Sequence, residues 1–190
     1  TTGILCALGV TAAVHQRERI GLGQRVDGSL LDTAVGLLAY HAEGYLLAGL
    51  VPKALGSGHP SLSPYRNFKC KDGQWVFIAA ANDRFWQKLA GALELGDLAT
   101  DSRFAVNQQR VKNRVELEAL LERDIGERER EPLLKLRGEA DVPATPVHTV
   151  DQVMNDPQTI ERGIVQKVIH PKLAEIPVVG TPLRFFAMNP

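Results

Sequence analysis

The stretch from residue 56 to residue 82 places the tightest limits on how this chain can fold. It opens with Gly56 and Gly58, which lack a Cβ, so the loop can adopt backbone angles closed to other residues and let a ligand approach the main chain. Strand-forming residues flank Asp72-Gly73, a strong signal for a hairpin turn. Asn82 then suits the N-cap of a helix. The stretch predicts a flexible glycine loop, a rigid antiparallel hairpin and a helix in succession, which suits a mobile flap over a site.

The remaining patterns predict further helices and extended segments. Ser29 is expected to cap the second helix, with Asp32 completing a pair like a capping box. Residues that precede prolines avoid the helical region, so the segment 142–147 is expected to be extended. The predicted helices span 4–19, 29–46, 83–95, 107–124, 133–139 and 150–155, and the predicted strands span 24–28, 165–169 and 176–179.

The same patterns predict which faces are buried. Residues 4–14 are apolar almost all round, as in a helix buried between two layers. Phe85, Trp86, Leu89 and Leu93 recur at helical spacing, which is typical of a core-facing stripe, and Phe104 is expected to dock on the same core. We interpret the charged side chains of 107–124 as a solvated face with helical ion pairs; they are Arg110, Lys112, Arg114, Glu116, Glu118 and Glu122. The mixed-sign run 127–131 is also expected at the surface.

Composition excludes several classes of function. Of the 190 residues, 44% are hydrophobic and 23% are charged, and the net charge is zero. No basic stripe runs along any predicted face, so a nucleic-acid partner is not indicated. The longest apolar run, 46–52, is too short to cross a bilayer. Cys6 and Cys70 are far apart in sequence, and the five histidines lack metal-ligand spacing, so we expect no disulfide framework, no metal and a cytoplasmic location.

No nucleophile and base can be paired from the residues alone. The serines lie in caps and loops, and the carboxylates lie on helix faces and turns. His59 has two readings: an acid–base or ligand-binding side chain, which would need a partner that the sequence does not name, or part of the loop structure beside Pro60. From the residues alone the chain is an α/β protein with a ligand-facing glycine loop.

An ordered set of short motifs along nearly the whole chain resembles the family III CoA-transferases. Each motif is weak alone, but their order is specific, and the loop and hairpin are most similar to the succinate–hydroxymethylglutarate branch. The motifs are Thr2-Gly3, Gly21-x-Gly23-Gln24-x-Val26-Asp27-x-Ser29-Leu30, Gly56-x-Gly58-His59-Pro60, Pro64-Tyr65, Asp72-Gly73, Ala81-Asn82-Asp83-x-Phe85, Arg103-Phe104 with Asn107, Arg110 and Arg114, Val142-Pro143, Asp156-Pro157-Gln158, His170-Pro171 and Gly180-x-Pro182-x-Arg184. One departure is Gly28, where the family has an apolar strand residue.

The resemblance implies a fold: part of a Rossmann-like large domain followed by a small α+β domain with an antiparallel hairpin or sheet. The expected boundaries are 1–48 for the large-domain part, 49–62 for a linker with the glycine loop, 63–148 for the small domain, and 149–190 for a segment returning to the large domain. The intact protein is then expected to be an interlocked homodimer.

The resemblance also implies an activity. Family members move CoA from an acyl-CoA to a carboxylic acid through an aspartyl-CoA thioester, so coenzyme A is a substrate and the acids are partners. The nucleophilic aspartate is expected just upstream of Thr1, so the chain contributes no catalytic residue and is expected to be an inactive fragment by itself. Gly56, Ser57, Gly58 and His59 would form the flap over the acyl-enzyme, and Leu30 is a candidate coenzyme-binding residue.

Two alternatives remain open. An α-methylacyl-CoA racemase shares this fold and moves a proton next to the thioester, and its acid–base residues also lie mainly outside the matching region. A non-catalytic interaction module is the second. The residues preceding Thr1 would discriminate between the two enzymes, since an aspartate two positions upstream supports a transferase.

Overall fold

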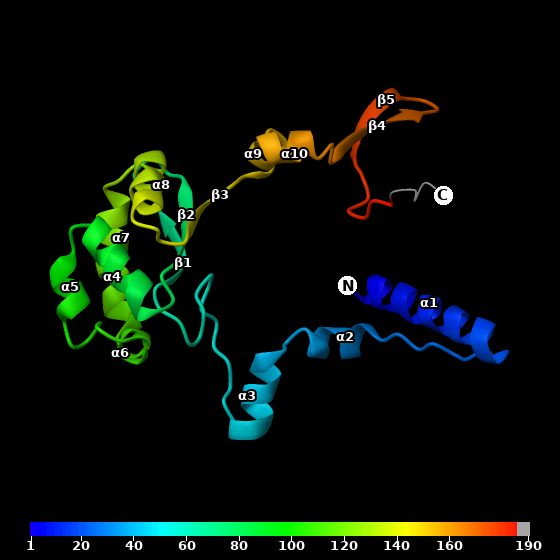
Figure 1. The fold of residues 1–190 in the computed structure, drawn as a ribbon, viewed down its shortest axis with the longest axis horizontal. Coiled ribbons are helices and arrows are strands. Elements are labelled where there is room, and N and C mark those ends of the chain that lie inside the picture. Colours follow the sequence, from blue (N-terminus) through cyan, green and yellow to red (C-terminus); the bar gives the residue numbers. More distant parts are fainter. Residues whose placement is uncertain (186–190) are drawn as a thin grey trace. The chain divides into compact units, whose positions relative to one another are not determined.

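The computed structural model describes residues 1–185 as a mixed helix-and-sheet protein (Figure 1). Contacts divide the chain into two units, Thr1–Ala54 and the part from Leu55 onward. The predicted α/β fold class is confirmed. The last five positions of the predicted returning segment, 186–190, lie outside the described residues.

The first unit contains three helices, α1 (Thr2–Ile20), α2 (Leu30–Gly36) and α3 (Tyr40–Ala48). Gly21 ends α1, close to the predicted end at residue 19, and its φ of 76° lies in the left-handed region that glycine reaches without strain. The Ser29 hydroxyl accepts a hydrogen bond from the Asp32 amide, which confirms the cap of α2. The predicted single helix over 29–46 is wrong, because the chain breaks between α2 and α3, where Ala39 has a φ of 45°.

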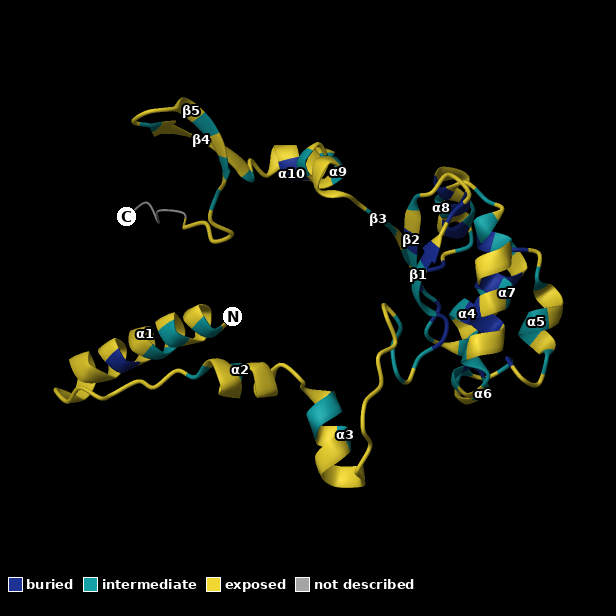
Figure 2. Ribbon diagram, turned by 180° about the vertical axis from the view of Figure 1, so that it is seen from behind, coloured by how far each residue is buried: buried dark blue, intermediate teal, exposed yellow. Residues whose placement is uncertain are grey.

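Two further expectations for this unit are wrong. Residues 24–28 are not a strand, because a strand requires ladder hydrogen bonds and no described segment pairs with these residues. Helix α1 is not enclosed between layers: Ala13 is the one buried residue among those described in this unit, and side chains such as Ile4 and Leu8 are 75% and 65% exposed. Figure 2 shows α1, α2 and α3 mainly in the colour of exposed residues.

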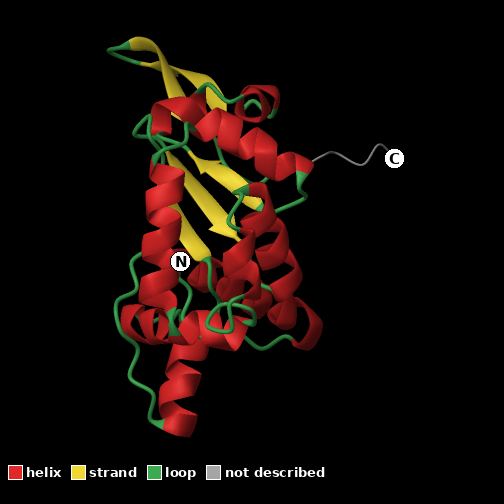
Figure 3. Ribbon diagram, turned by 90° about the vertical axis from the view of Figure 1, so that its left-hand side faces the viewer, coloured by secondary structure: helices red, strands yellow, loops and turns green. Residues whose placement is uncertain are grey.

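The second unit is built on a three-stranded antiparallel sheet. The predicted hairpin forms from β1 (Tyr65–Lys69) and β2 (Trp75–Ala79), with Gly73 at a φ of 77° in the turn. Strand β3 (Ala144–Val147), from the segment predicted to be extended, pairs with the other edge of β2, with Val76 opposite Pro146. The strands are the central yellow arrows of Figure 3.

Five helices of this unit surround its core. They are α4 (Asp83–Ala92), α5 (Gly96–Thr100), α6 (Asn107–Lys112), α7 (Arg114–Gly126) and α8 (Arg130–Glu139). The Asn82 side chain caps α4 by accepting a hydrogen bond from the Phe85 amide, as predicted. The buried cluster comprises Phe68, Cys70, Val76, Ile78, Ala80, Trp86, Leu89, Ala90, Leu93, Phe104, Leu117, Leu121, Ile125, Leu133 and Val142. The predicted stripe and the docking of Phe104 are thus confirmed, with Phe85 packed at the edge of the cluster.

Two predictions for this helical region are wrong. The helix predicted over 107–124 is divided at Asn113 into α6 and α7. The charged run 127–131 is not wholly at the surface, because Arg130 is only 8% exposed. Its main-chain amide donates to Asp72, and its guanidinium donates to Gln74, so this arginine fastens α8 to the hairpin turn.

The segment beyond the sheet carries smaller elements. These are the helices α9 (Val150–Met154) and α10 (Pro157–Glu161) and an antiparallel pair, β4 (Val165–His170) with β5 (Ala174–Val179). The predicted short helix and strand pair are confirmed. Within residues 1–185, no helix combines the length and the apolar character needed to cross a membrane.

Candidate functional site: the glycine loop and its support

The glycine loop 56–59 precedes strand β1 in the chain, and its role as a flap stays a prediction. Gly56 has a φ of 59°, so it requires glycine on conformational grounds. Gly58 does not have a positive φ; a Cβ there would instead lie 3.0 Å from the Leu55 carbonyl oxygen. The Gly58 amide donates to that same oxygen at 2.9 Å. The loop is therefore a tight turn in which the two glycines are needed for different reasons.

Side chains of the loop tie it to the hairpin. The Ser57 hydroxyl accepts a hydrogen bond from the Asn67 amide at 3.0 Å, and the His59 amide donates to the Tyr65 carbonyl at 3.3 Å. The His59 ring lies edge-on to Tyr65, and its Nδ1 accepts from the Ser61 amide at 3.2 Å. These contacts support the structural reading of His59, and its acid–base role stays a prediction.

Helices α6 and α7 hold the segment that follows the loop. One terminal nitrogen of Arg114 donates to the carbonyl oxygens of His59 at 2.6 Å, of Pro60 at 3.1 Å and of Leu62 at 3.3 Å. The Asn107 amide group bridges the same segment, since it donates to the Ser61 carbonyl at 2.8 Å and accepts from the Ser63 amide at 3.2 Å. Loop carbonyls that would otherwise need water therefore have charged or amide donors.

Arg110 fastens the end of this segment to the core. It is fully buried, and its guanidinium donates to the carbonyls of Ser63, Phe104 and Ala105 and to the Asp83 carboxylate at 2.8 Å. It also lies 5.7 Å from the ring centroid of Trp86. Burial lowers the pKa of Arg110, while the hydrogen bond to Asp83 acts in the opposite direction. The cation is retained inside the unit because its donors are satisfied.

The prediction of a solvated charged face was therefore wrong for Arg110, Arg114 and Glu118. The Arg114 and Glu118 side chains are only 13% and 11% exposed. A signal for this burial was present: Asn107, Arg110, Arg114, Leu117 and Leu121 follow one another at spacings of three and four residues. The polar residues thus lie at the same helical spacing as the buried leucines of α7. They were predicted to be exposed only because their side chains are polar or charged.

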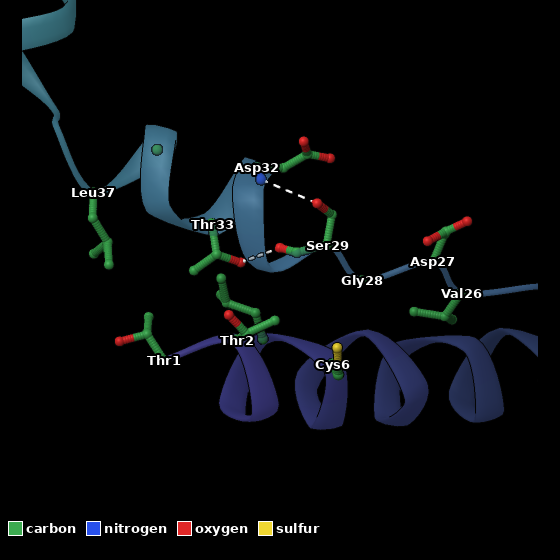
Figure 4. Close-up of a pocket in the computed structure, with 12 residues that line it drawn as sticks. Thr1, Thr2, Cys6, Val26, Asp27, Gly28, Ser29, Asp32, Thr33 and Leu37 are labelled. Atoms are coloured by element: carbon green, nitrogen blue, oxygen red, sulfur yellow. Dashed lines mark hydrogen bonds between the residues drawn. The ribbon is translucent and has the colours of Figure 1, made fainter.

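A separate cavity of about 540 Å³ lies in the first unit, between α1 and the segment that leads into α2 (Figure 4). It is lined by Thr1, Thr2, Leu5, Cys6, Val26, Asp27, Gly28, Ser29, Asp32, Thr33, Gly36 and Leu37. Figure 4 shows residues 26–28 running alongside α1, with Cys6 below Gly28. The candidate coenzyme-binding residue Leu30 is not part of this lining; it opens α2 and is 78% exposed. Its role stays a prediction.

The second unit thus combines a glycine loop with a supporting sheet and helices. The chain belongs to CoA-transferase family III, whose family model matches residues 1–189.

Curated relatives agree with this assignment. The chain is 32% identical over 182 residues to the succinate–glutarate CoA-transferase of Agrobacterium fabrum, which covers 96% of this chain and 45% of the relative. It is 36% identical over 190 residues to the succinyl-CoA:mesaconate CoA-transferase of Haloarcula hispanica, covering 100% of this chain and 47% of the relative. The human succinyl-CoA:glutarate CoA-transferase is 30% identical, with coverage of 97% and 42%. The chain thus spans about half the length of the curated relatives it matches.

Solved structures show the same fold. A CAIB/BAIF family protein from Brucella suis matches with a TM-score of 0.77 and 39% identity, covering 97% of this chain and 47% of that one. Rv3272 from Mycobacterium tuberculosis matches with a TM-score of 0.80 and 29% identity, covering 97% and 48%. The predicted resemblance is confirmed.

Proposed function

We propose that the whole protein transfers CoA from an acyl-CoA thioester to a carboxylic acid, and that the acceptor is a dicarboxylic acid. The observation that carries this proposal is the similarity along nearly the whole chain to relatives named for succinyl-CoA, glutarate and mesaconate. A loop whose turn requires Gly56, and whose end is fixed by Arg114, supplies a suitable wall for such a reaction.

The proposed chemistry uses an aspartate that precedes Thr1. Its carboxylate attacks the thioester carbon, the C–S bond breaks, and CoA leaves as a thiolate. The thiolate then attacks the aspartyl carbonyl of the mixed anhydride, which releases the donor acid and leaves an aspartyl-CoA thioester. The acceptor carboxylate and the returning thiolate repeat these two steps in reverse, giving the new CoA ester and the free aspartate. In this scheme the residues of this chain bind, orient and exclude water.

The test is a transfer assay on the whole protein. Incubation with succinyl-CoA and either glutarate or mesaconate should give the corresponding new CoA ester, followed by liquid chromatography and mass spectrometry. Replacement of the upstream aspartate by alanine should abolish the ester. Release of free CoA with no new ester, across a panel of dicarboxylic acids, would overturn the proposal.

The racemase alternative has its own readout. A racemase would exchange the α-proton of a 2-methylacyl-CoA for deuterium in heavy water, and a transferase without an acceptor acid would not. Exchange without transfer would favour the racemase.

We further propose that the whole protein is an interlocked homodimer in the cytoplasm. The long connection 49–62, which forms no helix or strand, supports the interlocked dimer. The two free cysteines, Cys6 and Cys70, support the cytoplasmic location. Sedimentation of the whole protein as a monomer would contradict the dimer.

A further inference from the structure

The side chain of Arg114 donates hydrogen bonds to several main-chain carbonyl groups of one short segment. The same terminal nitrogen serves the carbonyls of His59, Pro60 and Leu62, all in the segment at the end of the glycine loop. The other terminal nitrogen lies 3.9 Å from the point that a Cβ on Gly58 would occupy. The guanidinium therefore lies directly against the loop and gathers the carbonyl oxygen of His59, with two from the residues that follow the loop, around one positive charge.

The orientation of Arg114 is itself supported. Glu118, one helical turn further along α7, places a carboxylate oxygen 3.8 Å from the Arg114 Nε. Glu118 in turn accepts a hydrogen bond from Arg66 on strand β1 at 2.6 Å. The loop is thus connected through Arg114 and Glu118 to both the helix and the sheet, and its position is coupled to theirs.

We propose that Arg114 is a positioning residue, which holds the 56–59 loop in the conformation that CoA transfer requires. The proposal rests on the proposed function for its activity readout, and on the geometry of the loop for its structural one. A planar guanidinium can serve several acceptors in a fixed arrangement, whereas a lysine ammonium at the end of a flexible chain keeps the charge but not the arrangement. A loop displaced by a fraction of an ångström would leave binding largely intact and slow the chemical step.

Arg110 has a different role, although it also holds a carbonyl of this segment. Its other partners are Phe104, Ala105 and Asp83, inside the unit, so its replacement would disturb the core itself. Arg128 provides the matched control. It lies beyond the C-terminal end of α7, pairs with Asp124 and donates to the Leu93 carbonyl at 2.9 Å, and has no described contact with the loop.

The experiment compares Arg114→Lys and Arg128→Lys in the whole protein. Three quantities are measured for each: the melting temperature, the kcat and KM of transfer from succinyl-CoA, and the hydrogen exchange of the peptide covering residues 55–63. We expect kcat to fall roughly 10- to 100-fold in Arg114→Lys with KM little changed. We also expect faster exchange of the Gly58 and His59 amides and a larger fraction of CoA released by hydrolysis. Arg128→Lys should lower the melting temperature by a similar amount without these effects.

The outcomes separate the two proposals. If the parent transfers CoA and Arg114→Lys matches Arg128→Lys in kcat and loop exchange, the positioning role is refuted and the proposed function stands. If the parent does not transfer CoA, the proposed function fails, and loop exchange still decides whether Arg114 holds the loop. Should Arg114→Lys fail to fold, Glu118→Gln serves instead; it should give a smaller change in the same direction, and an unchanged kcat and exchange rate would refute the role.

Discussion

Two buried arginines of the second unit differ in whether their guanidinium groups have hydrogen-bond acceptors. Arg110 and Arg137 are both fully buried. Arg110 has carbonyl and carboxylate acceptors, whereas none of the three guanidinium nitrogens of Arg137 has a hydrogen-bond partner among the described residues. Burial lowers the pKa of Arg137 to about 10, so it still carries its charge at neutral pH. An uncompensated charge in this position opposes folding.

Replacement of Arg137 by methionine should therefore stabilise the protein. Methionine keeps a long unbranched side chain and removes the charge, and we expect the free energy of unfolding to rise by about 1–3 kcal/mol. Denaturant unfolding followed by tryptophan fluorescence measures the change. Arg137→Lys is the control, because it keeps a buried cation and should not stabilise. A loss of stability in Arg137→Met would show that Arg137 has a partner in the folded protein.

At the scale of elements, the contact between α1 and residues 24–28 depends on small residues. A Cβ on Gly28 would collide with the Cys6 sulfur, and a Cβ on Gly9 would lie 2.9 Å from a Val26 methyl group. Position 28, where the resemblance leads us to expect an apolar residue, thus carries a glycine, and the Cys6 side chain of α1 fills the space that a Cβ would occupy. The segment can run close to α1 although it forms no strand.

The pairing of Cys6 with Gly28 gives a double-variant prediction. Gly28→Ala should lower the free energy of unfolding by about 1–3 kcal/mol, because the added methyl group overpacks the contact. Combining it with Cys6→Ala, which removes the sulfur, should restore most of that loss. Thermal unfolding of the two single variants and the double variant measures the coupling. Simple additivity of the two single effects would contradict a direct contact.

The elements also show what the sequence alone could predict. The hairpin, the Asn82 cap and the stripe of Trp86 and Leu89 follow from local signals, and each is confirmed. The break at Asn113 was missed. The burial of Arg114 was missed although its spacing from Leu117 and Leu121 was a signal for it, because the carbonyl groups that it binds lie far away in sequence. The strand expected over 24–28 failed for a related reason: periodicity predicts an extended chain but supplies no partner strand.

The glycine loop was predictable from the sequence only in part. Its position and composition were predictable from Gly56 and Gly58, but only Gly56 has the positive φ expected of such glycines. Its anchoring by Asn107 and Arg114 depends on a long-range contact, which no local pattern encodes.

At the scale of the whole molecule, the two units differ in how much apolar surface they bury. The buried cluster of the second unit lies within residues 68–142. In the first unit, large side chains such as Leu30, Leu46 and Leu47 are 78%, 73% and 84% exposed. Because exposed apolar surface on this scale often marks an interaction site, we expect the first unit to pack against further protein surface.

Separate expression of the two parts tests this difference. A fragment of residues 55–148 should unfold in one cooperative transition, reported by the fluorescence of the buried Trp86. A fragment of residues 1–54 should bind a dye that fluoresces on apolar surfaces and should self-associate. Cooperative unfolding of 1–54 as a monomer, or a non-cooperative transition of 55–148, would contradict the prediction.

The strand order of the sheet has a consequence for synthesis on the ribosome. Strand β2 is central, and its second partner, β3, is translated only after helices α4 to α8. The hairpin of β1 and β2 can form early, but one edge of β2 then presents unpaired amides and carbonyls until residues 144–147 emerge. During that interval the nascent chain offers a site where a strand of another molecule could pair, so slow translation between the hairpin and β3 would favour misassembly.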